Sequence, residues 1–147
     1  MHMSPLVGRK TVSESLKTIL ICVDSYDEAC MKGLVYHGSL DEAQKFQSLM
    51  QLLLIIEQIL DVTEYPKPTV EKRRFHSFKD SDEDIIHLNK EFDFQNLSGN
   101  LATFKVKIMF RQHASWQGSV SWIENNNTEP FRSALELLML MHSAMTE

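Results

Sequence analysis

Apolar and polar residues alternate along residues 104–111, a pattern that is typical of a half-buried β-strand. Phe104, Val106, Ile108 and Phe110 alternate there with Lys105, Lys107, Met109 and Arg111. Successive side chains of a strand point to opposite faces of the sheet, so we expect the first set in the core and the second set, with Arg111, in solvent. A second strand is expected around Gly118–Trp122, and a short third strand is expected to end at Phe131.

Two runs of consecutive apolar residues, Leu52–Ile56 and Leu137–Met141, predict helices with an unusually wide apolar surface. Their starts are marked by Ser48 with Gln51 and by Ser133 with Glu136. This spacing fits a capping box, in which the serine accepts from the third helical N–H and the Gln or Glu reaches back to the cap. We therefore predict helices near residues 48–60 and 133–145.

The pattern of the second half repeats that of the first half at a constant, gap-free offset of 85 residues. Residues 19–23 then align with residues 104–108, and the strands, turns and helix starts coincide. Identical residues at this offset are Thr18/Thr103, Ala29/Ala114, Gly33/Gly118, Val35/Val120, Phe46/Phe131, Ser48/Ser133, Leu52/Leu137 and Leu53/Leu138. This agreement predicts an internal duplication of a β-β-β-α unit.

The predicted fold class is α+β, with an antiparallel sheet and two helices packed on one of its faces. We expect a single domain over residues 1–147, with unit one at 18–61, a charged connector at 62–101 and unit two at 102–147. The apolar runs are wider than the face that a helix lays on a sheet. We therefore expect the sister helix and a second subunit to cover the rest, which predicts a homodimer.

The composition restricts the class of protein only mildly. Of the 147 residues 43% are hydrophobic and 24% are charged, which is ordinary for a globular domain. The net charge of −5 gives no support to a nucleic-acid-binding protein, which is usually basic. The densest basic stretch, residues 67–74, is followed at once by acidic residues 80–84, as in a solvated connector.

Neither a signal peptide nor a membrane-spanning apolar segment is apparent in the sequence. The only two cysteines, Cys22 and Cys30, do not make a disulfide framework. We therefore expect a cytoplasmic protein without membrane contact. The sequence lacks a phosphate-binding glycine loop and the usual hydrolase and zinc motifs, and its histidines are dispersed. No catalytic residue, metal or cofactor is assigned, and an enzyme is the reading we favour least.

The predicted hairpin at residues 111–122 is the candidate binding site, because both tryptophans of the chain fall there among residues that hydrogen-bond and stack. An open alternative is that Trp116 and Trp122 belong to the core and the polar residues only form a turn. The candidate binding residues are Arg111, Gln112, His113, Trp116, Gln117, Trp122 and, after the hairpin, Arg132.

The stretch FRQHASWQGSVSW at residues 110–122, followed by FRSALEL at 131–137, resembles a family of small bacterial proteins of unknown function. Their C-terminal part reads FRQ(N/H)ASWQGxVxW and then FRSxLEL. The resemblance is specific over about 102–145 and looser over 18–60, and His113 stands where Asn is expected. It implies a fold and a site location but no activity.

These observations favour a non-enzymatic interaction or adaptor module that presents the 111–122 hairpin to a protein partner. The alternative is a nucleic-acid-binding or regulatory protein that uses Arg111, Trp116 and Arg132. In that alternative Lys105, Lys107 and Arg111 would share one exposed strand face and contact phosphates.

Overall fold

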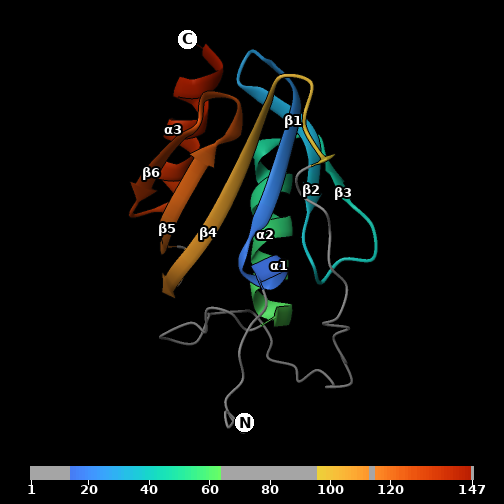
Figure 1. Ribbon diagram of the computed structural model, residues 1–147, viewed down its shortest axis with the longest axis vertical. Helices are drawn as coiled ribbons and strands as arrows, with labels where there is room; N and C mark the ends of the chain where they lie inside the picture. Colours follow the sequence, from blue (N-terminus) through green and yellow to red (C-terminus); the bar gives the residue numbers. More distant parts are fainter. Residues whose placement is uncertain (1–13, 64–95, 113–114, 147) are drawn as a thin grey trace, which may run out of the picture.

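The computed structural model describes residues 14–63, 96–112 and 115–146, which form one antiparallel sheet with helices packed against it (Figure 1). The strand order is β3-β2-β1-β4-β5-β6. The first half contributes α1 (Glu14–Lys17), β1 (Ile19–Asp27), β2 (Cys30–Tyr36), β3 (Gln44–Phe46) and α2 (Leu49–Thr63). The second half contributes β4 (Ala102–Gln112), β5 (Ser115–Trp122), the 3₁₀ turn η2 (Ile123–Asn125), β6 (Asn127–Phe131) and α3 (Ala134–Thr146). The predicted α+β class is confirmed.

Both long helices, α2 and α3, lie behind the sheet in the view of Figure 1 and run in opposite directions. The core forms where Leu52 and Ile56 of α2, and Leu137 and Met141 of α3, meet the inward side chains of the strands. Within each helix the two residues are four positions apart and therefore lie on one face. The remaining members of both apolar runs are half-buried or exposed.

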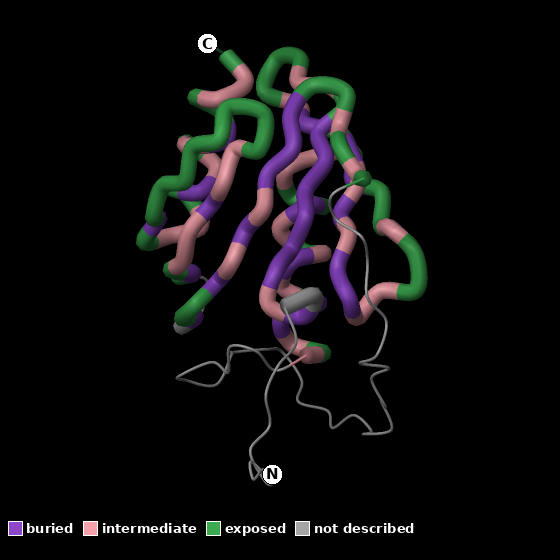
Figure 2. The backbone as a smooth tube through the Cα atoms, in the orientation of Figure 1, coloured by how far each residue is buried: buried purple, intermediate pink, exposed green. Residues whose placement is uncertain are grey.

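Residues 19–23 of the central strand β1 are buried on both faces of the sheet (Figure 2). Ile19, Ile21 and Val23 belong to the core beneath the helices. Leu20 and Cys22 alternate with them and so point to the opposite face, yet they are only 1% and 2% exposed. A continuous apolar run, as opposed to an alternating one, is the sequence pattern that such a strand requires.

Capping hydrogen bonds fix the start of both long helices, one residue after the predicted serine. At α2, Ser48 Oγ accepts from the Gln51 N–H at 3.1 Å, as the capping box predicts. The returning bond differs from the prediction, because Gln51 Oε1 accepts from the N–H of Gln47, the residue before the cap, at 2.8 Å. The same two bonds recur at α3, from the Glu136 N–H to Ser133 Oγ at 3.0 Å and from the Arg132 N–H to Glu136 Oε1 at 2.7 Å.

A β-bulge in β4 decides which side chains of the second hairpin reach the core. The pairing with β5 shifts between Ile108 and Phe110, so Met109 is an extra residue. An extra residue reverses the alternation for the rest of the strand. Phe110, predicted to be buried, is 61% exposed, whereas Arg111, predicted to be exposed, is 2% exposed. Both predictions were wrong because alternation in the sequence gives no sign of a bulge.

The first hairpin has its own bulge at the equivalent place, between Val23 and Ser25 of β1. Two glycines on the partner strands, Gly33 and Gly118, are required by close packing. A Cβ atom would lie 2.0 Å from the Cys22 carbonyl oxygen at Gly33, and 1.8 Å from the Lys107 carbonyl oxygen at Gly118. Bulges and glycines therefore recur at the offset found in the sequence.

The register between β1 and β4 has the same regularity. Leu20 pairs with Lys105, which is the residue 85 positions later, and the pairing runs antiparallel on both sides of this point. Exchanging the two halves of the chain therefore returns the same strand pairing. These correspondences support the internal duplication, which stays a prediction.

Left-handed backbone closes two of the turns. Asn126 has a φ of 52° between η2 and β6, as expected for an asparagine in a tight turn. Between β1 and β2 the two turn residues, Glu28 and Ala29, have φ values of 51° and 63°. Positive φ at both positions is the geometry of a type I′ hairpin, which usually contains Asn or Gly.

Most of the predicted connector, residues 62–101, lies outside the described residues, but its return to the sheet is visible. The Leu101 N–H donates to the Val23 carbonyl at 2.8 Å, and the Asn100 N–H donates to Asp24 Oδ1 at 3.0 Å. Gly99 lies so close to β1 that a Cβ atom would be 2.6 Å from the Val23 backbone. These contacts attach the connector to the bulge of β1.

Candidate functional site

The predicted hairpin residues do not form one exposed surface. Trp122 is half-buried, and Gln112 pairs through its backbone with Ser115 at the end of the hairpin. The side chain of Gln112 and the whole of His113 lie outside the described residues. Of the remaining predicted residues, Arg111 and Trp116 are buried, whereas Gln117 and Arg132 are exposed.

Arg111 is the centre of a polar cluster between the second hairpin and the first helix. Its Nη1 lies 2.9 Å from Asp61 Oδ1 and 3.6 Å from Glu57 Oε2, and its Nη2 donates to the Leu60 carbonyl at 3.0 Å. Trp116, paired with Arg111 across the strands, donates its indole N–H to Glu57 Oε1 at 3.3 Å. We call these five residues the Arg111 clasp.

The Arg111 clasp also gives a hydrogen-bond donor to a backbone carbonyl at the C-terminal end of α2. The last four carbonyls of a helix have no partner within it, and the carbonyl of Leu60 is the first of these four in α2. A guanidinium at this place meets the negative end of the helix dipole as well as two carboxylates. The bulge turns Arg111 towards these two carboxylates and the helix end. A buried cation is tolerated here because its charge and its hydrogen-bond donors have partners.

The first hairpin has a matching contact with the second helix. Tyr26 Oη lies 2.6 Å from His142 Nδ1, and the two rings pack edge to face with their centroids 5.6 Å apart. Tyr26 is the residue 85 positions before Arg111, and His142 is the residue 85 positions after Glu57. Each hairpin therefore contacts the helix of the other half, with different chemistry at the two places.

Glu57 and Asp61 were not among the predicted site residues. They lie four residues apart near the end of a mostly apolar helix, so they share one face of it. Two carboxylates on one face, next to apolar residues, indicate a buried cation on another element. That signal could have pointed to a partner, although not to Arg111 in particular.

The basic face proposed for nucleic acid is not present. Lys105 and Lys107 alternate with core residues, so they point away from the helices, and both are half-buried. Arg111 lies on the other face of the sheet because of the bulge. The expectation that these three side chains share one exposed face was therefore wrong.

Exposed apolar side chains occur instead on the helices and at the bulge. On α2 and α3 they occupy equivalent positions four residues apart, so each helix carries a short apolar stripe on the side away from the sheet. At the bulge, Met109 and Phe110 are 52% and 61% exposed. The exposed fractions on the helices are 64% for Met50, 58% for Leu54, 66% for Leu135 and 55% for Met139.

Two buried titratable groups have shifted pKa values. Burial lowers the pKa of the His37 imidazole to about 4, against a hydrogen bond to the Leu16 carbonyl that acts in the opposite direction. Burial, followed by the charges of Asp24 and Glu124, raises the pKa of the Cys22 thiol to about 11. Both groups are therefore neutral and unreactive at pH 7.

Within the described ranges, no three His, Cys, Asp or Glu side chains are placed to hold a metal ion. No helix in this part of the chain is long and apolar enough to cross a membrane. Comparisons of the chain with protein-family models, with curated proteins and with solved structures found no match.

Proposed function

We propose that this protein is a non-enzymatic interaction module whose contact surface is the outer side of α2 and α3. The observation that carries the proposal is the pair of exposed apolar stripes, Met50 with Leu54 and Leu135 with Met139. Each of these side chains is more than half exposed, although Leu52, Ile56, Leu137 and Met141 already supply the core contacts. Contiguous exposed apolar residues are typical of protein interaction sites.

This proposal moves the contact surface away from the 111–122 hairpin. Arg111 and Trp116 are buried in the clasp and are not available to a partner. The nucleic-acid alternative is not proposed, since the basic face on which it rested is not formed.

A second copy of the chain is the first partner that we propose. The stripes occupy equivalent positions on two antiparallel helices on the same side of the sheet. The stripe of α2 in one copy can therefore meet that of α3 in the other, and the reverse contact follows from two-fold symmetry. Burial of four large apolar side chains per copy favours association.

We place the module in the cytoplasm. Cys22 and Cys30 are both free thiols in the structure, although the first is buried and the second only partly so. Free thiols in a folded domain are typical of a reducing compartment.

The decisive experiment combines Leu54→Glu with Met139→Glu and measures the molar mass by light scattering at high micromolar concentration. We expect twice the chain mass of 17.0 kDa for the wild type and 17.0 kDa for the variant, with unchanged far-UV circular dichroism. The charge-matched control, Lys45→Glu, changes the net charge by the same two units at an exposed position of β3 that points away from the helices, and it should stay dimeric. A monomeric wild type would refute the homodimer, and a variant that stays dimeric would refute the helix surface.

A further inference from the structure

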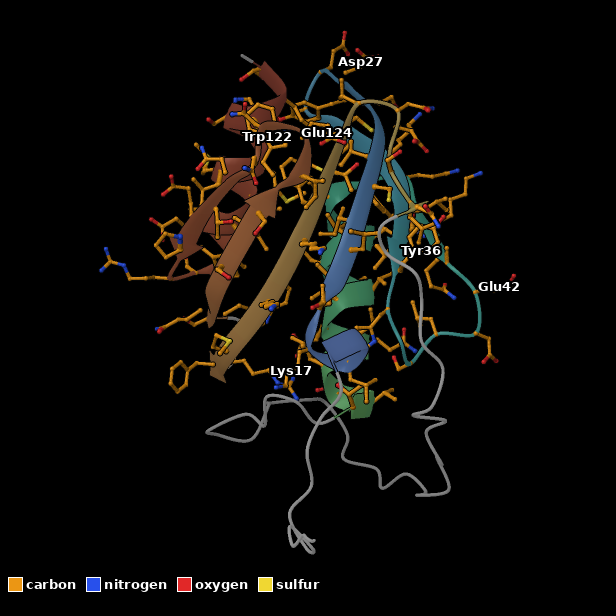
Figure 3. All side chains as sticks on the ribbon, viewed as in Figure 1. Lys17, Asp27, Tyr36, Glu42, Trp122 and Glu124 are labelled. Atoms are coloured by element: carbon orange, nitrogen blue, oxygen red, sulfur yellow. The ribbon has the colours of Figure 1, made fainter. Side chains whose placement is uncertain are left out.

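A pocket of about 210 Å³ lies between α3 and the sheet, at the end where β5 passes into η2. Trp122 and Glu124, labelled in Figure 3, lie at this end of the molecule. The pocket is separate from the Arg111 clasp and from the exposed apolar stripes. Its lining residues are Phe104, Val120, Trp122, Asn125, Asn127, Glu129, Leu140, Ser143 and Ala144.

Small side chains on α3 leave this space open. Ser143 and Ala144 line the pocket, and the positions 85 residues earlier on α2 are Gln58 and Ile59. Ile59 is 2% exposed and belongs to the core, whereas Ala144 is only half-buried. The smaller side chain at position 144 therefore leaves a space in the second half at the place that Ile59 fills in the first half.

The wall of the pocket that the sheet supplies also differs between the two halves of the chain. The position equivalent to Trp122 is His37, whose ring nitrogens lie 2.9 Å from Ser39 Oγ and 3.0 Å from the Leu16 carbonyl oxygen. These partners bury His37 to 1% exposure. Trp122 stays half-buried and presents its indole to the pocket instead.

The lining is apolar at the base and polar at the rim. Phe104 and Val120 are buried in the sheet, and Trp122 adds an aromatic surface. Amide groups come from Asn125 and Asn127, and Glu129 supplies the only charge among the lining residues. A carboxylate next to an indole attracts a cation and repels an anion.

We propose that this pocket binds a small aromatic or heteroaromatic cation, with its ring against Trp122 and its amidinium or ammonium group at Glu129. The volume suits a ligand of this size, because a cavity of about 150 Å³ accommodates one benzene ring. Pockets that join an apolar base to a few polar groups are the usual form of small-molecule sites. This inference is independent of the helix contact surface.

The test titrates the full chain with benzamidine, benzamide and benzoate, which share a ring and differ in charge. Binding is followed by ligand-observed NMR and by tryptophan fluorescence. We expect benzamidine to bind with a millimolar dissociation constant, at least about tenfold tighter than benzoate, because Glu129 attracts the amidinium and repels the carboxylate; a tenfold difference corresponds to about 1.4 kcal/mol. No saturable benzamidine binding, or equal binding of all three probes, would overturn the proposal.

Two variants locate the site. Ala144→Ile places the residue of the first half in the pocket, and it should weaken benzamidine at least about tenfold without lowering the melting temperature. Glu129→Gln, at an exposed rim position, should remove the preference for benzamidine over benzamide. Gln117→Ala, an exposed residue outside the pocket lining, is the control and should bind as the wild type does. Unchanged benzamidine binding in both pocket variants would place any bound probe elsewhere and refute this site.

Discussion

Replacing Arg111 by Ala tests the Arg111 clasp directly. The substitution removes a bond to the Asp61 carboxylate and a bond to the Leu60 carbonyl, and it deletes a fully buried side-chain stem. Hydrogen bonds to charged groups are worth about 1.5–3 kcal/mol each. The side chains of Glu57 and Asp61 are 22% and 36% exposed, so water can partly replace the lost cation. We therefore expect a loss of about 3 kcal/mol in the free energy of unfolding, at the lower end for a broken buried ion pair.

The assay is urea unfolding followed by far-UV circular dichroism. With a slope of about 2 kcal/mol per molar urea, the midpoint of Arg111→Ala should fall by about 1.5 M. Arg111→Met keeps the stem and should lose less, whereas Arg132→Ala, at an exposed position, should stay within about 0.5 kcal/mol of the wild type.

A double-mutant cycle assigns the effect to the ion pair. The effects of Arg111→Met and Asp61→Asn on the free energy of unfolding should differ from additivity by about 1 kcal/mol or more, because either substitution alone breaks the same ion pair. A loss below about 0.5 kcal/mol in Arg111→Ala is the value for an arginine in solvent, and it would refute the clasp.

Four further predictions follow from local features. Ser133→Ala should lower the stability by about 1 kcal/mol in a thermal melt, since it removes the cap of α3; an unchanged melt would contradict that cap. Replacing Glu28 and Ala29 by Asn and Gly should raise the stability by about 1 kcal/mol, because both residues have positive φ. The contribution of His37 to stability should be complete above pH 6.5 and fall by up to about 3 kcal/mol towards pH 4, because the unfolded chain takes up a proton near pH 6.5 and the folded chain only near pH 4. His37→Gln should make the free energy of unfolding depend less on pH over this range. Cys22, with its pKa raised to about 11, should react with a thiol reagent at pH 8 only after denaturant is added.

Features set by neighbours in the sequence were predicted well. The strands around residues 104–108, the capping serines Ser48 and Ser133, and the apolar faces of both helices depend on local patterns, and they were found at or within a few residues of the expected positions. The left-handed conformation of Asn126 also has a local cause, because asparagine tolerates positive φ on its own.

Features set by distant contacts were not predicted. The bulge at Met109 leaves no mark in the alternating pattern of apolar and polar residues, so that pattern predicted Phe110 to be buried and Arg111 to be exposed. The partners of Arg111 lie 50 residues away on α2, and no spacing rule connects them. The pocket beside Trp122 was missed for another reason, since a cavity depends on the small size of Ala144, and a missing side chain gives no signal in a pattern of apolar residues.

The pairing of β1 with β4 has a consequence for either half of the chain in isolation. Residues 14–63 alone would carry β1 as an open sheet edge, which is a surface that pairs with other strands. Because Leu20 faces Lys105 at the equivalent position, the same register would let two copies of this half join edge to edge, with Leu20 facing Leu20. Such a half would be stable only as a concentration-dependent pair. Joining both halves in one chain makes their association intramolecular, so the pairing of β1 with β4 does not depend on the protein concentration. The two hairpins then need not be identical, and one carries Arg111 where the other carries Tyr26.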